Sequence, residues 1–254
     1  MKKYIALLRQ YPRKPSRNDL NKDLHIAIEK GEPATVLAIL KSNADVNHIN
    51  QNDKTPLHVG AEKGDKTITQ ILLESGANIN APTKHGYTPL HWAAIMGREA
   101  VSEILLRAGA NRHARLSKGP WIGENPLHCA ARFGHTNTAT LFLEYASSES
   151  IQSAEELLHS KDNDDLTPLH VAARGGYTNT VLSLIAYKAP LEARTNLGAT
   201  PLYLAITHGK FQVANSLIQA GANSESKANN GQTPKQVATE SGFSEIDELI
   251  QRAN

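Results

Sequence analysis

The sequence has a single cysteine, Cys129, and aromatic side chains make up only 5% of its 254 residues. One thiol cannot close an internal disulfide or build a cysteine-based zinc site. No apolar run approaches the length of a bilayer span, and the run Tyr4 to Leu8 is too short for a secretory signal peptide. With 27 basic and 25 acidic side chains, the chain also lacks a strong net charge. We expect a protein of a reducing, cytoplasmic compartment, and composition alone assigns no function.

The charged side chains are unevenly distributed along the chain. Residues 1–17 carry basic side chains and no acidic one: Lys2, Lys3, Arg9, Arg13, Lys14 and Arg17. We expect residues 1–21 to form a basic N-terminal arm or a helix that caps the first repeat. An alternative is that this arm binds nucleic acid or a membrane surface, which predicts a steep dependence of binding on salt.

What the chain has in abundance is internal repetition. The tetrapeptide Thr-Pro-Leu-His occurs at 55–58, 88–91 and 167–170, and close variants begin at 125, 200 and 233. Three of the intervals are 33 residues (55 to 88, 167 to 200, 200 to 233), and the other two are longer. A second motif, a leucine-rich end followed by Gly-Ala-Asn, closes units at 76–78, 109–111 and 221–223. Repetition at this period is typical of solenoid proteins.

In these two motifs the sequence resembles the ankyrin-repeat family, over about 90% of its length. The resemblance implies an all-α solenoid of about seven helix-turn-helix units with short hairpin-like fingers between them. The expected domain spans 22–254, after the arm of 1–21. Its repeats are expected at about 22–49, 50–82, 83–119, 120–161, 162–194, 195–227 and 228–254.

The physical chemistry of one unit supports the same architecture. Thr55 is a suitable N-cap, and Pro56 suits the first helical position because its missing N–H costs nothing there. Gly64 can end this short helix in the left-handed conformation. The apolar stripe that starts at Ile68 then predicts a longer second helix. No unit of this size buries its apolar face alone, so neighbouring units must stack.

Two junctions are longer than the repeat requires. Residues 115–122 add a segment that we expect to lengthen one finger. Residues 147–160 predict an extended second helix or a short extra helix near 152–159, with Ser153 and Glu156 as a capping box. Such insertions tend to lie on one face of a solenoid, although drift without function explains them equally well.

Nothing in the sequence predicts catalysis, a metal ion or a cofactor. The histidines His25, His58, His91, His128 and His170 share one repeat position, so successive copies lie too far apart to bind one ion. The resemblance implies that this histidine holds the turn by hydrogen bonds. Cys129 occupies an apolar slot of the first helix, and we expect a packed thiol. The alternative, a cysteine-dependent enzyme, predicts that Cys129→Ala abolishes activity.

The resemblance implies protein recognition through the finger tips and the exposed, concave face of the first helices. The middle repeats carry aromatic, apolar and arginine side chains at these positions, the types enriched in interface hot spots. The candidate partner-binding residues are His85, Tyr87, Ile95, Met96, Trp121, Ile122, Arg132, Phe133, Leu166 and Arg174. The alternative is that the loop with Trp121 covers Met96 and Phe133 as internal packing.

The sequence therefore predicts a non-catalytic adaptor, scaffold or inhibitor that binds a protein partner as a monomer, with no cofactor and without binding nucleic acid or a membrane. A further hypothesis is a bacterial effector that acts by protein binding in the cytosol of a host cell.

Overall fold

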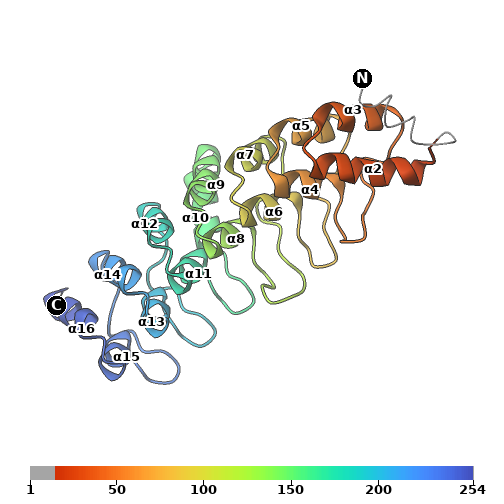
Figure 1. Ribbon diagram of the computed structural model, residues 1–254. Coiled ribbons are helices and arrows are strands. Elements are labelled where there is room, and N and C mark those ends of the chain that lie inside the picture. The colour runs from red at the N-terminus through yellow and green to blue at the C-terminus, as the bar shows by residue number, and fades with distance from the viewer. Residues whose placement is uncertain (1–14, 254) are drawn as a thin grey trace. The chain divides into compact units, whose positions relative to one another are not determined.

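The computed structural model describes residues 15–253, in which every regular element is a helix (Figure 1). The described chain divides into two compact units, one up to Lys118 and one from Gly119 onward. Most of the arm expected at 1–21 lies outside the described residues. The first described helix, α2, begins at Arg17, inside that arm, and is capped by Ser16.

The first unit contains three helix pairs. Its first helices are α2 (Arg17–Glu29), α4 (Pro56–Lys63) and α6 (Pro89–Ile95), and its second helices are α3 (Pro33–Lys41), α5 (Lys66–Glu74) and α7 (Glu99–Arg107). Each first helix packs on its own second helix, and like helices pack on like from one pair to the next. Two rows of helices result within this unit, visible in Figure 1.

The second unit repeats the pattern with one addition. Its first helices are α8 (Pro126–Arg132), α11 (Pro168–Gly175), α13 (Pro201–Thr207) and α15 (Pro234–Glu240). Its second helices are α9 (Thr136–Glu149), α12 (Thr178–Ala186), α14 (Phe211–Gln219) and α16 (Ser244–Ala253), and α10 (Ile151–His159) is extra. The predicted all-α fold of helix-turn-helix units is confirmed for the described residues.

The ends of the first helices form as the sequence predicts. Pro56, Pro89, Pro126, Pro168, Pro201 and Pro234 each open a first helix directly after an extended N-cap residue. Gly64 ends α4 in the left-handed region, with φ of 81°. The buried core consists of the apolar faces turned toward neighbouring helices, among them Leu57, Ile68 and Leu72 in the first unit.

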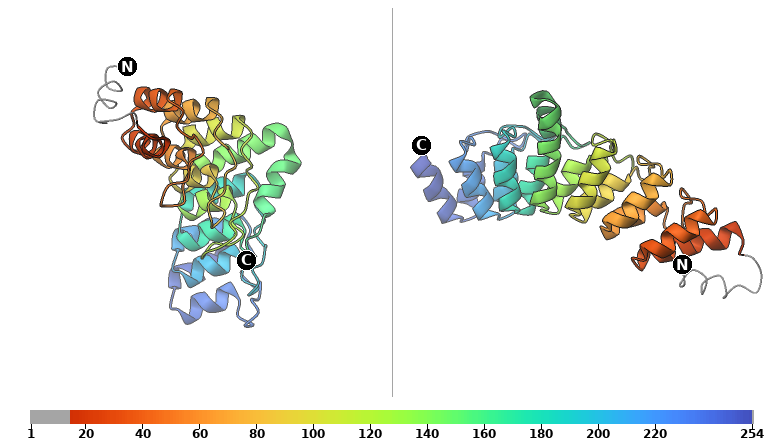
Figure 2. Two further views of the ribbon diagram at one scale, coloured as in Figure 1. Left: turned by 90° about the vertical axis from the view of Figure 1, so that its right-hand side faces the viewer. Right: turned by 90° about the horizontal axis from the view of Figure 1, so that it is seen from above.

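The insertion at 147–160 both extends a helix and adds one. Helix α9 is 14 residues long, whereas α12 and α14 have nine, and Figure 2 shows it extending beyond them. The capping box predicted at Ser153 and Glu156 is wrong: the N-cap of α10 is Ser150, whose hydroxyl accepts from the Ser153 amide at 3.0 Å. Four serines lie within seven residues here, and only Ser150 has the extended backbone that a cap needs, with φ of −167°.

The fingers between repeats are closed by one recurring backbone bond. The amide of Thr83 donates to the Tyr87 carbonyl at 2.8 Å, and Asp162 and Thr195 make the equivalent bonds to Leu166 and Ala199 at 3.0 Å. Neighbouring fingers of the second unit are also tied together, because the Asn196 amide donates to the Asp164 carbonyl at 3.0 Å. These bonds give the predicted fingers their hairpin-like form and a fixed spacing.

Candidate partner-binding surface

In three repeats, the residue directly before the Thr-Pro or Asn-Pro pair and the residue eight positions later face each other across the finger and the first helix. In the first unit, Lys54 pairs with Glu62 at 2.8 Å. In the second unit, Glu124 pairs with Arg132, and Gln232 donates to Glu240 at 2.7 Å. We call this recurring arrangement the finger–helix pair. It places the side chains that vary between repeats at one surface, formed by the fingers and the first helices.

The first unit carries an aromatic cluster at this surface. The Lys54 ammonium lies 3.4 Å from the centroid of the Trp92 ring, and the Tyr87 ring lies 5.5 Å from Trp92. A cation over an indole face is an attractive contact. Tyr87 also meets His91 edge-on at 6.1 Å, so this candidate residue is largely occupied by contacts within its own unit. Sequence reasoning missed Trp92, which stands in a slot otherwise filled by Val59 or Leu204.

The remaining candidates of the first unit lie around this cluster. His85 is exposed, and its carbonyl accepts from the Ser117 amide at 2.8 Å. Ile95 is half-buried at the end of α6, and the Met96 side chain after it is 39% exposed. The unit therefore presents Met96 and His85 to solvent and holds Tyr87 and Ile95 more closely.

In the second unit, the lengthened finger packs on the end of α8. The Trp121 ring meets Phe133 edge-on at 5.5 Å, and the Arg132 guanidinium lies 5.2 Å from the Trp121 ring centroid. Phe133 stacks in turn on His135 at 6.4 Å. The structure thus brings Trp121, Arg132 and Phe133 together, while the Ile122 side chain stays 37% exposed beside them. This contact agrees with the alternative for Phe133, but Met96, which that alternative also buries, is 39% exposed.

Arg132 is hydrogen-bonded to a buried acid that the sequence reasoning did not single out. Its Nε donates to the two carboxylate oxygens of Glu124 at 2.8 and 3.1 Å, and Glu124 is completely buried. Burial raises the pKa of Glu124, and the hydrogen bonds from Arg132 act in the opposite direction. The only sequence signal is the spacing of eight residues, which Lys54 and Glu62 share.

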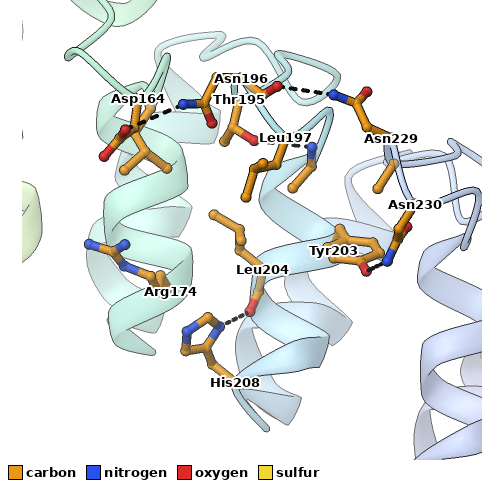
Figure 3. Close-up of a pocket in the computed structure, with 13 residues that line it drawn as sticks. Asp164, Arg174, Thr195, Asn196, Leu197, Tyr203, Leu204, His208, Asn229 and Asn230 are labelled. Atoms are coloured by element: carbon orange, nitrogen blue, oxygen red, sulfur yellow. Dashed lines mark hydrogen bonds between the residues drawn. The ribbon is translucent and has the colours of Figure 1, made fainter.

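A groove of about 460 Å³ lies at the same surface farther along the second unit. It is bounded by three consecutive fingers and by α11 and α13, as Figure 3 shows. We call it the Leu197 groove. The residues that line it are Asp164, Leu166, Arg174, Thr195, Asn196, Leu197, Ala199, Tyr203, Leu204, His208, Ala228, Asn229 and Asn230.

The groove has an apolar floor and one prominent apolar wall. Leu197, at a finger tip, is 71% exposed, and its side chain converges with that of Leu204 in Figure 3. The candidate Leu166 is only 5% exposed, so it contributes to the floor. Polar groups at the edge are fixed: Asn230 donates to the Tyr203 hydroxyl at 3.0 Å, and His208 bonds to the Leu204 carbonyl at 2.9 Å through Nδ1.

Arg174, the last candidate, connects the groove to the cluster around Arg132. It is half-buried, and burial together with the nearby charge of Arg132 lowers its pKa. The carboxylates of Glu124, Asp162 and Asp164 act in the opposite direction. Of the ten candidates, Leu166 and Arg174 therefore share one groove, and Arg132 lies within electrostatic reach of Arg174.

The repeated histidines have the structural role that the resemblance implied. His58 bonds through Nε2 to the Tyr87 carbonyl at 3.0 Å, and through Nδ1 to the Thr55 amide at 3.1 Å. His128 and His170 make the same Nε2 bond to the carbonyls of Leu166 and Ala199, at 3.0 and 3.1 Å. Each bond crosses from one repeat to the finger of the next. Cys129 is fully buried on α8, and burial raises the pKa of its thiol.

Two further properties concern residues 15–253 as a whole. This part of the chain contains no group of three or more His, Cys, Asp or Glu side chains that is placed to hold a metal ion. None of its helices has both the length and the apolar character that crossing a bilayer requires.

Stacked pairs of short antiparallel helices joined by fingers define a helical repeat protein. The family model for ankyrin repeats matches residues 24–116, 113–195 and 142–228, and the chain belongs to the ankyrin-repeat family. The search of curated proteins found no match to this sequence.

Two solved structures show the same fold. The human ASB11 ankyrin repeat domain aligns with a TM-score of 0.77 and 24% identity, over 91% of this chain and 97% of that one. The ankyrin repeat domain of Bcl-3, a unique member of the IkappaB protein family, aligns with a TM-score of 0.72 and 24% identity. That alignment covers 89% of this chain and 97% of the Bcl-3 chain.

Proposed function

We propose that this chain is a non-catalytic protein-binding module that acts as an adaptor, scaffold or inhibitor and holds its partner at the Leu197 groove. Ankyrin repeats are generally protein–protein interaction modules. The observation that carries the choice of surface is the exposure of Leu197 above an apolar floor. A leucine that is 71% exposed gains about 1.5–3 kcal/mol when a partner buries it.

The geometry supports this surface over others in the second unit. The groove is concave, with apolar side chains at its centre and fixed polar groups at its edge, as in most binding sites. The basic arm and delivery to a host cell are hypotheses with no supporting observation in residues 15–253.

The test compares proteins captured from a cell lysate by the full chain and by a Leu197→Asp variant, with quantitative mass spectrometry. We expect the specific partner to be depleted at least about tenfold by the variant, because a charge at the finger tip resists burial. Leu182→Asp is the matched control, since Leu182 is an exposed leucine on α12 that does not line the groove. Equal capture by wild type and Leu197→Asp would reject the proposed surface.

A further inference from the structure

Arg174 has no partner at the position that pairs with the equivalent helix residue in three other repeats. In the register of Lys54–Glu62, Glu124–Arg132 and Gln232–Glu240, the residue eight positions before Arg174 is Leu166. A leucine cannot accept a hydrogen bond from a guanidinium. In the part of the chain that the structure describes, no hydrogen bond or ion pair joins Arg174 to another residue, and no dashed line reaches it in Figure 3.

Without a partner, the guanidinium of Arg174 is energetically unfavourable in these surroundings. Arg174 is half-buried, so water solvates its guanidinium incompletely. The nearby guanidinium of Arg132 is already paired with Glu124 and repels Arg174. Asp162 and Asp164 attract Arg174 only at longer range. The Oδ1 atom of Asp162 accepts from the amides of Asp164 and Leu166, at 2.9 and 2.8 Å, which fixes this carboxylate on its own finger.

The place that a partner of Arg174 would occupy lies next to apolar surface. Arg174 and Leu166 line the same groove as Leu197 and Leu204, and the groove is open to solvent along the fingers. A ligand that reaches Arg174 from this groove therefore also covers the two leucines. A volume of about 460 Å³ suits a few side chains of one segment better than a broad, flat protein surface.

We propose that the Leu197 groove binds an extended peptide segment of a partner protein, in which an Asp or Glu carboxylate pairs with Arg174 and an adjacent apolar side chain packs between Leu197 and Leu204. The partner's carboxylate takes the role that Glu124 plays for Arg132. This inference rests on the proposed function and names the chemistry of its ligand.

A carboxylate fits this position better than a phosphate. One unpaired guanidinium is offered, and Glu124, Asp162 and Asp164 surround it with negative charge. The second charge of a phosphate meets no further unpaired guanidinium here, because Arg132 is already paired with Glu124, and the nearby carboxylates of Asp162 and Asp164 repel it.

The experiment uses the full chain and a library of ten-residue peptides in which one position is fixed and the others are mixed. Binding of each pool is measured by fluorescence polarisation. We expect pools with Asp or Glu near Leu, Ile or Phe to bind at least about tenfold more tightly than pools with Lys or Arg in place of the acid. Arg174→Glu should reverse this preference toward basic pools, and Arg174→Met should abolish it.

The matched control is Lys227→Glu, which changes the charge equally at an exposed finger lysine that does not line the groove. It should keep the preference for acidic pools. Circular dichroism establishes that each variant folds. If Arg174→Glu does not fold, Arg174→Met alone tests the preference for acidic pools. The inference is overturned if no pool binds, if phosphoserine pools bind more tightly than acidic ones, or if the preference survives in both Arg174 variants.

The inference and the proposed function fail in different ways. Peptides that bind without regard to acids, yet are lost on Leu197→Asp, would reject the carboxylate partner and leave the groove as a binding surface. Equal capture of proteins from the lysate by wild type and by Leu197→Asp would reject the groove itself.

Discussion

The histidine of each Thr-Pro-Leu-His motif is buried and is held in one protonation state, the neutral ring. In His170, Nε2 faces the carbonyl of Ala199 and must carry the proton, so Nδ1 accepts from the Thr167 amide at 3.1 Å. A protonated ring would lose that acceptor and place a charge in the core. Burial accordingly lowers the pKa of His170 from 6.5 to about 4, and it lowers the pKa of His25 and His58 as well.

These histidines should make the protein less stable in acid. As the pH falls from 6.5 toward 4, the unfolded chain binds a proton at His170 and the folded chain does not, so the free energy of unfolding decreases. For His170 alone we expect a loss of about 2 kcal/mol between pH 7 and pH 5. Urea denaturation at both pH values measures it. His170→Gln, although less stable at pH 7, should lose less on acidification; an equal loss in both proteins would contradict the assignment.

At this scale the sequence predicted positions better than contacts. The register located Arg132, Phe133 and Arg174 at one surface, because each stands at a fixed distance from its helix-ending glycine. It did not show that Glu124 lies beneath Arg132, since that pairing depends on how the finger folds back onto α8. It also did not show that Leu166, directly before Thr167, is buried whereas Leu197, three residues before Thr200, is 71% exposed, because that depends on how each finger folds.

At the scale of elements, the joints between helices depend on a side chain from the next repeat. Tyr177, the N-cap residue of α12, lies against both Gly134 and Gly175, and a Cβ at either glycine would overlap its ring. Gly134 ends α8 with φ of +69°. Gly209 has the equivalent position after α13, with φ of +63°, and has open space around it.

An alanine scan of these two glycines should separate backbone strain from overlap. Both Gly134→Ala and Gly209→Ala carry the left-handed backbone penalty, about 1–2 kcal/mol. Gly134→Ala should cost about 1–3 kcal/mol more, because the new methyl group displaces Tyr177. Thermal or urea denaturation measures both. Adding Tyr177→Ala should remove the difference, and an equal cost in the two single variants would show that the tyrosine moves aside freely.

The first helices from α4 onward were predictable because a Thr-Pro or Asn-Pro pair precedes each and a glycine follows it. The insertion was predictable only in part. Its length indicated extra helix, and both an extended α9 and a separate α10 formed. The start of α10 was not predictable, because Ser150 and Ser153 offer the same capping hydroxyl and the break after α9 decides between them.

At the scale of the whole molecule, each unit is a series of nearest-neighbour contacts. Within the second unit, α13 packs on α11, α14 and α15, whereas α16 packs on α14 and α15. In a repeat protein, stability is roughly the sum of each repeat and its interfaces. The 33-residue period predicted this arrangement. It could not predict the Leu197 groove, which needs three fingers at their folded spacing.

Amide hydrogen exchange should reveal this arrangement. Amides of α11 and α13 should exchange more slowly than those of α15 and α16, because interior helices are held from both sides. Mass spectrometry of peptic fragments measures the rates in the full chain. Uniform protection across these four helices would indicate one cooperative unit without end effects.

The histidine bond that joins repeats ends on a backbone carbonyl, and its acceptors belong to residues as different as Tyr87, Leu166 and Ala199. Because every amino acid supplies a carbonyl, this hydrogen bond does not depend on which side chain stands just before Thr-Pro. That same residue faces the partner-binding surface. Evolution can therefore rewrite what the surface recognises, or duplicate and delete a 33-residue unit in frame, without redesigning how one unit attaches to the next.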